Sequence, residues 1–379
     1  MGLKSNQNSA ARLPRIGVGS GGLGGTDTPD YSFDKVALSA LQLSFSLGMT
    51  FVDTAALYGG GHSEELVGQA IAGKRDEIFV ATKVAPENLA PDDLRQSLDG
   101  SLQRLRTDYV DLYQVHWSNP AVPLEETMGA LEALVDEGKI RHIGVCNFSM
   151  AELKEAQAAL RRTRLFSLQS EYNLFDRFAE TALIPYCRDN GMVFLAYSPL
   201  DQGSICGDRQ RRARLAEMAA KYECSEATLA LAWLTAGDQV TAIPKAGKSH
   251  HVRENALAAS IDITSDDYAE IDVLCQAAPV EIPVDDIRVV PPDNGGRKVY
   301  STLEEALQNE HGFVPSPATL AGQISGGEFL KPVRVRKSEG ISRKTDAPYE
   351  LLEGRIRYWA WVIAGEGEKP IPCLIRGGN

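Results

Sequence analysis

Four polar side chains stand at the ends of successive short apolar runs: Asp53, with Tyr58 five residues later, then Lys83 and His116. Because the carboxyl ends of parallel strands meet on one face, these side chains are expected to converge. A phenol has an ordinary pKa of ~10, which a neighbouring ammonium lowers toward working pH. Each residue alone is more often structural. Together they predict a proton donor, held by a carboxylate and a lysine, with a histidine that orients a carbonyl oxygen.

The elements that must position these residues follow a repeating pattern. Eight apolar runs predict strands at 15–18, 50–53, 78–83, 110–116, 142–147, 167–172, 192–197 and 241–244. Amphipathic stretches between them predict helices at 33–47, 63–72, 91–105, 124–137, 149–160, 179–190 and 211–236, the last broken near Cys224, with another at 265–277. Ser63 is the expected N-cap of its helix, and Ser149 with Glu152 a capping box. Eight strand–helix repeats predict an α/β fold, a (β/α)₈ TIM barrel.

A glycine-rich segment, residues 19–25, offers an alternative that we do not favour. It contains glycines at many spacings, but no acidic residue ends a second strand about 20 residues further on, as a dinucleotide fingerprint requires. The segment is therefore not predicted to begin a Rossmann fold.

Composition limits the classes of function. The chain has 379 residues and a formal net charge of −12, which argues against nucleic-acid partners. It contains no apolar run long enough for a membrane span and no secretion signal at its start. Six scattered cysteines without a CxxC pair predict ordinary reduced thiols, a cytoplasmic protein and no metal site.

Three short sequence motifs that contain the polar strand-end residues resemble those of a known family. FVDTAALY, ATK and DLYQVH carry the four residues, and the chain resembles the aldo-keto reductases over residues 12–278. The resemblance implies that Asp53, Tyr58, Lys83 and His116 form a catalytic tetrad. It also implies an oxidoreductase that interconverts an aldehyde or ketone with its alcohol, using a nicotinamide cofactor and a small-molecule carbonyl substrate.

The same resemblance implies a set of cofactor contacts along the chain. Asn147 and Gln169 would hold the carboxamide, Tyr197 would stack on the nicotinamide, and Lys245 would meet a 2′-phosphate. The full set is Ser20, Gly21, Asp53, Cys146, Asn147, Gln169, Tyr197, Ser198, Leu200, Lys245, Ala246, Gly247, His251, Glu254 and Asn255. Ala246 and His251 depart from the usual serine and arginine, so NADP(H) is favoured over NAD(H) only modestly. A short segment after the seventh strand, residues 201–208, suggests an incomplete cofactor belt.

From about Pro279 the predicted elements become shorter and are separated by proline-rich stretches. We therefore place a domain boundary between residues 1–278 and 279–379. A strand and turn are expected at 281–287, and further strands at 332–336, 349–352 and 371–376. Helices are expected from 301, at 320–324 and at 355–364, the first opened by a capping box of Ser301 and Glu304. This small α+β domain resembles the ParB N-terminal domain, a fold shared with sulfiredoxin, through residues 330–336 and 349–360.

In that resemblance Gly354 and Arg357 match a Gly-x-x-Arg phosphate motif, with Arg355 beside them, which implies a possible nucleotide or phosphate site. Arg355 stands where sulfiredoxin has its reactive cysteine, so sulfiredoxin chemistry is not expected. The alternative is a helix start with solvated arginines. We therefore predict an NADP-preferring aldo-keto reductase fused to a ParB-like domain. A cofactor-bound sensor or scaffold, or a bifunctional reductase and small-molecule kinase, are the rival hypotheses; the oligomeric state is left open.

Overall fold

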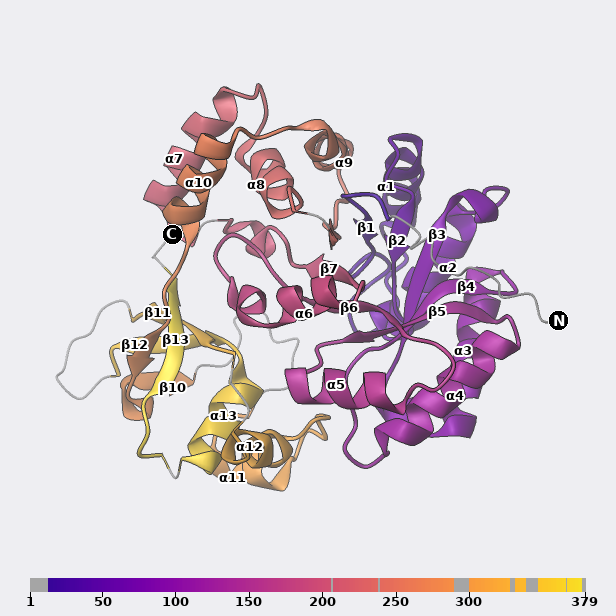
Figure 1. Cartoon of the computed structure of the whole chain (residues 1–379). Coiled ribbons are helices and arrows are strands. Elements are labelled where there is room, and N and C mark those ends of the chain that lie inside the picture. The colour runs from indigo at the N-terminus through magenta and orange to yellow at the C-terminus, as the bar shows by residue number, and fades with distance from the viewer. Residues whose placement is uncertain are drawn as a thin grey trace.

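The structure is a computed structural model, and it describes residues 13–205, 207–237, 239–289, 300–327, 331–338, 347–365 and 367–376. These residues form an eight-stranded sheet and a separate five-stranded sheet, each with its own hydrophobic core. Figure 1 shows the C-terminal domain, in orange and yellow, lying beside the larger unit on the side of α5 and α6.

The eight-stranded sheet is parallel throughout, in the order β1 to β8. Its strands are β1 Val18–Gly19, β2 Phe51–Asp53, β3 Phe79–Val84, β4 Val110–Val115, β5 Ile140–Cys146, β6 Leu165–Glu171, β7 Val193–Tyr197 and β8 Val240–Ala242. The sheet closes on itself because Ile16 bridges Ala242 and the Gly17 N–H donates to the Ala242 carbonyl at 2.8 Å. The predicted (β/α)₈ barrel is therefore the observed fold.

Helices follow the strands in the predicted alternation. They are α1 Asp34–Ser46, α2 His62–Ala70, α3 Pro91–Leu105, α4 Leu124–Asp136, α5 Met150–Ala159, α6 Leu183–Asp189, α7 Arg209–Ala220, α8 Glu226–Leu234, α9 Ser249–Leu257 and α10 Ser265–Cys275. Helix α5 begins with the predicted capping box of Ser149 and Glu152. The helix expected over 179–190 starts later, because residues Phe178–Thr181 form a 3₁₀ turn first.

The prediction for Ser63 is wrong. The N-cap of α2 is Gly61, in a left-handed conformation, and Ser63 lies inside the helix. Its buried hydroxyl instead donates to the Ser20 hydroxyl at 2.8 Å, across to the segment after β1. A side-chain oxygen can cap a helix only from the residue before the first turn, and the three consecutive glycines move that position two residues back.

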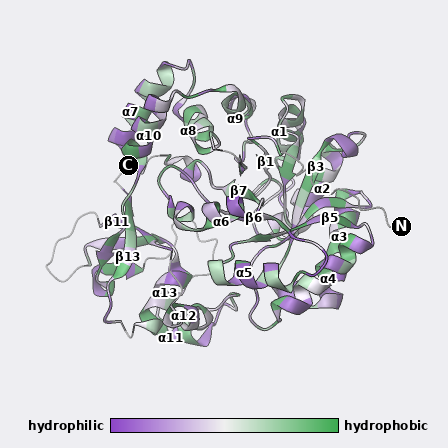
Figure 2. Ribbon diagram, viewed as in Figure 1, coloured by the Kyte–Doolittle hydropathy of each residue, from purple (hydrophilic) through white to green (hydrophobic). Residues whose placement is uncertain are grey.

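Figure 2 shows hydrophobic and hydrophilic residues alternating along the helices around the sheet. Trp233, Phe194 and Leu168 are among the side chains that are almost fully buried between sheet and helices. A second cluster of Phe51, Ala81, Leu112, Leu195 and Ile243 forms a separate hydrophobic group contributed by the strands β2, β3, β4 and β7 and the residue after β8. Most buried side chains in the barrel are apolar, so the buried polar side chains at the strand ends need a functional explanation.

The C-terminal domain is a mixed sheet in the order β10-β12-β11-β13-β9. Its elements are β9 Val280–Ile282, β10 Ile287–Val289, α11 Leu303–Gln308, α12 Pro317–Ser325, β11 Val333–Lys337, β12 Tyr349–Glu353, α13 Arg355–Ala364 and β13 Ile371–Arg376. The capping box of α11 uses Thr302 and Glu305, one residue later than the predicted pair of Ser301 and Glu304. The predicted bounds of α13 and β13 are confirmed.

The expectation of reduced thiols throughout is wrong at one position. Cys275 is disulfide-bonded, whereas Cys146, Cys187, Cys224 and Cys373 are free. Among the described helices, none combines the length and the apolar character that a membrane crossing needs.

Candidate active site

The structure brings the four polar strand-end residues together at the carboxyl end of the barrel. The Lys83 ammonium, which is 0% exposed, lies 2.6 Å from Asp53 Oδ2 and donates to the Tyr58 hydroxyl at 3.1 Å. A third donor of the ammonium reaches the Thr54 carbonyl at 3.0 Å. All three protons of the lysine are therefore used, so the ammonium is fixed between the carboxylate and the phenol.

The electrostatics of this trio depend on burial. Burial opposes the charged form of Lys83, but the Asp53 carboxylate, together with Tyr58 and Cys146, outweighs it, and the pKa of the lysine is raised. Burial also raises the pKa of Tyr58 above its ordinary value of 10, and the Lys83 charge offsets that rise only in part. The lysine lowers the pKa of the phenol, as predicted, but the prediction that this pKa falls toward working pH is wrong, since desolvation is the larger effect. The phenol keeps its proton at neutral pH, as a proton donor must.

His116 completes the group beside the Tyr58 ring. Its ring meets the Tyr58 ring edge-on, with 5.7 Å between centroids, and stacks on Trp117 at 3.8 Å. Burial, and then the Lys83 charge, lower the pKa of His116 well below its ordinary value. The imidazole is therefore neutral at neutral pH, and it can donate one hydrogen bond to a substrate oxygen.

The glycines after Tyr58 have a conformational reason. Gly59, Gly60 and Gly61 all have positive φ angles, of 58°, 61° and 97°. A Cβ atom on Gly59 would lie 2.3 Å from the Gly24 carbonyl oxygen, so no larger residue fits there. The left-handed run turns the chain sharply from β2 into α2 and holds Tyr58 over the barrel mouth.

Residues expected to contact the nicotinamide lie at the ends of β5, β6 and β7. Asn147 has a φ of 61° and accepts a hydrogen bond from the Tyr197 hydroxyl at 2.9 Å. Its amide donates to the His116 carbonyl at 3.2 Å, which joins the ends of β4, β5 and β7. Cys146 contacts the Gln169 side chain, with 3.7 Å between the Cys146 Sγ and the Gln169 Oε1. The residues predicted to contact the nicotinamide, Cys146, Asn147, Gln169 and Tyr197, therefore lie next to one another.

Gln169 has a partner that the sequence did not indicate. Its amide donates to Asp53 Oδ1 at 2.7 Å, and Gln114 donates to the same oxygen at 3.3 Å. Asp53 is thus held by two amides and one ammonium, and all of its contacts are charge-assisted. Strand alternation was the available signal for Gln114, because it lies two residues before His116 and points to the same side.

Residues expected at the adenosine end lie around β8 and α9. The Lys245 ammonium is near the glycine-rich segment after β1, where a Cβ on Gly22 would lie 3.3 Å from it. His251 pairs with Glu254, with 3.0 Å between ring nitrogen and carboxylate, and Asn255 is buried. Ala246 is buried and Gly247 half-buried at the same corner. Ser20 is also buried and bonds to Ser63, and a Cβ on Gly21 would lie 3.6 Å from the Tyr58 ring, so both lie near Tyr58 and α2.

The predicted phosphate motif of the C-terminal domain is largely engaged with its own backbone. Arg357 Nη1 donates to the carbonyls of Lys331 and Pro332, at 2.9 and 2.7 Å, and Arg355 Nη1 donates to the Leu352 carbonyl at 3.0 Å. Gly354 has a φ of 91°, and its missing Cβ leaves room for Arg357 Nη2, 2.9 Å from where that atom would be. The motif therefore forms a compact corner at the start of α13.

Comparison with known proteins agrees with this geometry. The aldo/keto reductase family model matches residues 15–275. The methylglyoxal reductase YeaE of Escherichia coli is 36% identical over 261 residues, which cover 69% of this chain and 90% of that protein. The NADH-specific methylglyoxal reductase of the same organism is 31% identical over 304 residues, covering 67% of this chain and 92% of the relative.

Solved structures give the same result. The thermostable aldo-keto reductase Tm1743, in complex with the inhibitor epalrestat, is 40% identical with a TM-score of 0.67, covering 72% of this chain and all of that one. An aldo/keto reductase from Klebsiella pneumoniae, in complex with NADP and acetate, is 35% identical with a TM-score of 0.64, covering 69% of this chain and 92% of its own. The barrel fold and these relatives place the chain in the class of NAD(P)H-dependent carbonyl reductases. The chain belongs to the aldo/keto reductase family.

Proposed function

We propose that this protein is an NADP-preferring reductase of small aldehydes or ketones in which Tyr58 is the general acid. One observation carries the proposal: the buried Lys83 ammonium lies between the Asp53 carboxylate and the Tyr58 hydroxyl, at 2.6 and 3.1 Å. An ammonium whose own pKa is raised by a buried carboxylate stays charged, and it stabilises the phenolate that forms when Tyr58 gives up its proton.

The residues divide the work of reduction. Tyr58 donates its proton to the carbonyl oxygen, which becomes the alcohol, and neutral His116 donates a hydrogen bond that holds that oxygen in place. Lys83 stabilises the phenolate, and Asp53 keeps the lysine charged and oriented. When bound, the reduced nicotinamide supplies the hydride.

The residues present fit such a cofactor. Asn147 and Tyr197 are already joined by a hydrogen bond beside the tetrad, so an amide and an aromatic ring are in place for the carboxamide and the nicotinamide. Exposed Lys245 beside Gly22 is the cation that would meet a 2′-phosphate. NADP(H) is favoured for this reason, although one relative is NADH-specific and His251 replaces the usual arginine.

Two methylglyoxal reductases among the relatives support a small dicarbonyl such as methylglyoxal as a candidate substrate. The test is oxidation of NADPH and of NADH over a panel of aldehydes and ketones that includes methylglyoxal. We expect Tyr58→Phe to lose roughly 10²- to 10⁴-fold in kcat while its affinity for the cofactor is retained, as loss of a general acid predicts. Full activity in Tyr58→Phe would refute the assignment. Turnover far below ~1 s⁻¹ on every substrate would favour the sensor or scaffold hypothesis.

A second candidate function concerns the C-terminal domain, which we propose is ParB-like and binds a nucleotide or phosphate near Gly354, Arg355 and Arg357. Two observations favour it: Arg357 makes no ion pair with the described residues, and Gly354 at the start of α13 has a positive φ. The test is the thermal shift of the full chain with ATP, ADP and CTP. A shift that disappears in Arg357→Ala would support the site. Hydrolysis of the nucleotide, or a phosphorylated product, would point to the bifunctional hypothesis. The absence of a thermal shift with any nucleotide would refute the proposed site.

A further inference from the structure

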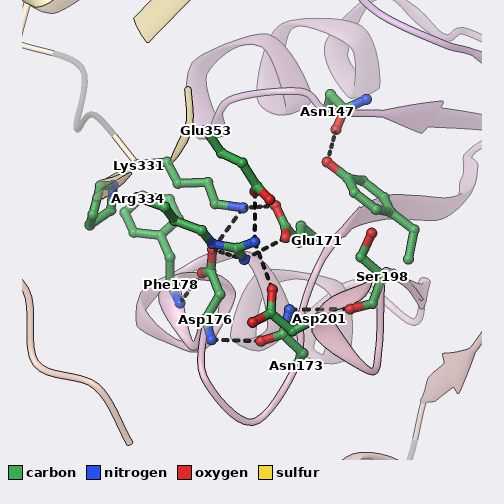
Figure 3. Close-up of polar contacts among 12 residues, drawn as sticks. Asn147, Glu171, Asn173, Asp176, Phe178, Ser198, Asp201, Lys331, Arg334 and Glu353 are labelled. Atoms are coloured by element: carbon green, nitrogen blue, oxygen red, sulfur yellow. Dashed lines mark hydrogen bonds and ion pairs between the residues drawn. The ribbon is translucent and has the colours of Figure 1, made fainter. Parts of the chain in front are cut away.

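A buried arginine of the C-terminal domain contacts the barrel at the segments that follow β6 and β7. Val333 and Val335 of β11 face the core of their own domain, so Arg334 between them points the other way, toward the barrel. Its side chain is 2% exposed, and Nη1 lies 2.8 Å from Asp201 Oδ1 (Figure 3). Nη2 bonds to Glu171 and lies 3.2 Å from Asp176. All three carboxylates belong to the barrel.

Two further cations complete this contact. Lys331 reaches Glu171 at 2.6 Å and Asp176 at 3.0 Å, and Arg376 of β13 bonds to Asp201. We call the whole group the interdomain ion cluster; its members are Glu171, Asp176, Asp201, Lys331, Arg334, Glu353 and Arg376. Burial opposes ionisation of Glu171, but the charges of Lys331 and Arg334 outweigh it and lower its pKa to about 2. The carboxylate is therefore charged, and the pairing fixes how the domain sits on the barrel.

The barrel side of the cluster is the segment that follows β7. Glu171 ends β6 in register with Tyr197, the last residue of β7, and Asp201 comes four residues after Tyr197. We call residues 198–205 the β7 loop. Four of its non-glycine residues have positive φ angles: Ser198, Asp201, Gln202 and Ile205. Backbone in this region is strained, and such strain persists only where surrounding contacts fix it.

The ion cluster provides those contacts in the middle of the β7 loop and, through one further residue, at its start. Asp201 is 0% exposed, and its Oδ1 receives both Arg334 and Arg376, while the Gln202 amide donates to Glu353 at 3.2 Å. The start of the loop is tied in through Asn173, whose amide donates to the Ser198 carbonyl at 3.2 Å and whose oxygen accepts from the Asp176 N–H at 2.7 Å. Asp176, whose carboxylate pairs with Arg334, is thus linked to Ser198 through Asn173 alone.

We propose that Arg334 is a positioning residue for the cofactor: the C-terminal domain holds the strained β7 loop in the conformation that binds the pyrophosphate of NADP(H), and so sets how tightly the cofactor is held. The proposal rests on the proposed function, which places Ser198 and Leu200 along the cofactor. The cluster makes no direct contact with Tyr58, Lys83 or His116 among the described residues. Loss of Arg334 therefore acts on cofactor binding and leaves the proton-donating trio intact.

The test compares cofactor affinity with turnover in the full chain. In Arg334→Met, an apolar side chain of similar length replaces the cation. We expect the Kd of NADPH, measured by fluorescence, to rise at least ~tenfold, equivalent to ~1.4 kcal/mol. The dissociation rate should rise in parallel, and kcat at saturating NADPH should stay within about twofold. Arg334→Lys should recover part of the affinity, because it restores the charge but not the two-pronged geometry.

The matched control is Arg336→Met on the same strand. Arg336 pairs with Glu350 inside its own domain and is 45% exposed, so its loss should leave the Kd of NADPH unchanged. If Arg334→Met fails to fold, Asp201→Asn decides the question from the barrel side, since it weakens the same contact without removing the cation. An unchanged Kd in Asp201→Asn and in any folded Arg334→Met would overturn the proposal, as would a loss of kcat with Kd unchanged. Failure of the wild-type protein to bind NADPH would instead refute the proposed function.

Discussion

Replacing Lys83 by methionine separates the structural cost of the buried ion pair from its catalytic use. The lysine is 0% exposed and Asp53 2%, with 2.6 Å between their charged atoms. Lys83→Met leaves a buried carboxylate that keeps only the amides of Gln114 and Gln169, at 3.3 and 2.7 Å. Removing one partner of a buried pair costs about 3–5 kcal/mol in the free energy of unfolding.

For a domain of this size that cost corresponds to a fall in Tm of roughly 6–20 °C, at about 2–4 °C per kcal/mol. The double variant Asp53→Asn with Lys83→Met removes both charges, so we expect it to regain most of the lost stability. Neither variant regains activity, because the Tyr58 phenolate is no longer stabilised, and kcat should remain at least ~10²-fold below wild type in both. Thermal unfolding and NADPH oxidation, measured on the same samples, give the two quantities.

Two outcomes would contradict this reasoning. If the double variant is as unstable as Lys83→Met, the cost lies in packing and not in the unpaired Asp53 charge. If Lys83→Met keeps wild-type kcat, the ammonium does not assist the acid. Lys139→Met is the control: its ammonium pairs with Asp99 at 2.7 Å on the exposed surface, so stability should change by no more than ~1 kcal/mol.

Two further predictions concern the acid and the turn that carries it. Burial raises the pKa of Tyr58 above 10 and lowers that of His116 well below 6.5, so the phenol stays protonated and the imidazole neutral between these values. The kcat/KM for reduction should therefore be flat from about pH 6.5 to about pH 10 and fall only above that; a titration limb near neutral pH would be inconsistent with the buried acid. Gly59→Ala forces a Cβ to within 2.3 Å of a carbonyl oxygen at a φ of 58°, and we expect unfolding free energy to drop by more than ~1 kcal/mol and turnover to drop with it. Gly129→Ala, where a Cβ would meet no atom within 4 Å, should be neutral or stabilising in chemical denaturation, and equal effects of the two substitutions would count against the steric argument.

Much of the barrel could be read from local patterns. Apolar runs alternating with amphipathic stretches place all eight strands within a few residues, because strand and helix periodicities are local properties. The capping box of Ser149 and Glu152 and the bounds of α3 and α13 were predictable for the same reason. The prediction for Ser63 failed because three left-handed glycines, each with its own steric environment, shifted the start of α2.

The tetrad lies between these two cases. Strand order alone places Asp53, Lys83 and His116 at one face, so their proximity follows from the sequence once a barrel is assumed. The direction of the Tyr58 pKa does not follow, because it depends on how much water the fold removes from around the phenol. The amides of Gln114 and Gln169 on Asp53 likewise depend on distances between strands that periodicity does not encode.

By itself, the sequence determined the class of fold and the family, and it indicated the residues that we propose carry out carbonyl reduction, since all of these rest on residue type and local spacing. Only the tertiary structure decided how the C-terminal domain contacts the barrel. Arg334 and Asp201 are 133 residues apart, and each reads locally as an ordinary charged residue. Their pairing exists because the folding of two separate cores removes both charges from water, and a buried charge requires a partner wherever the chain brings one.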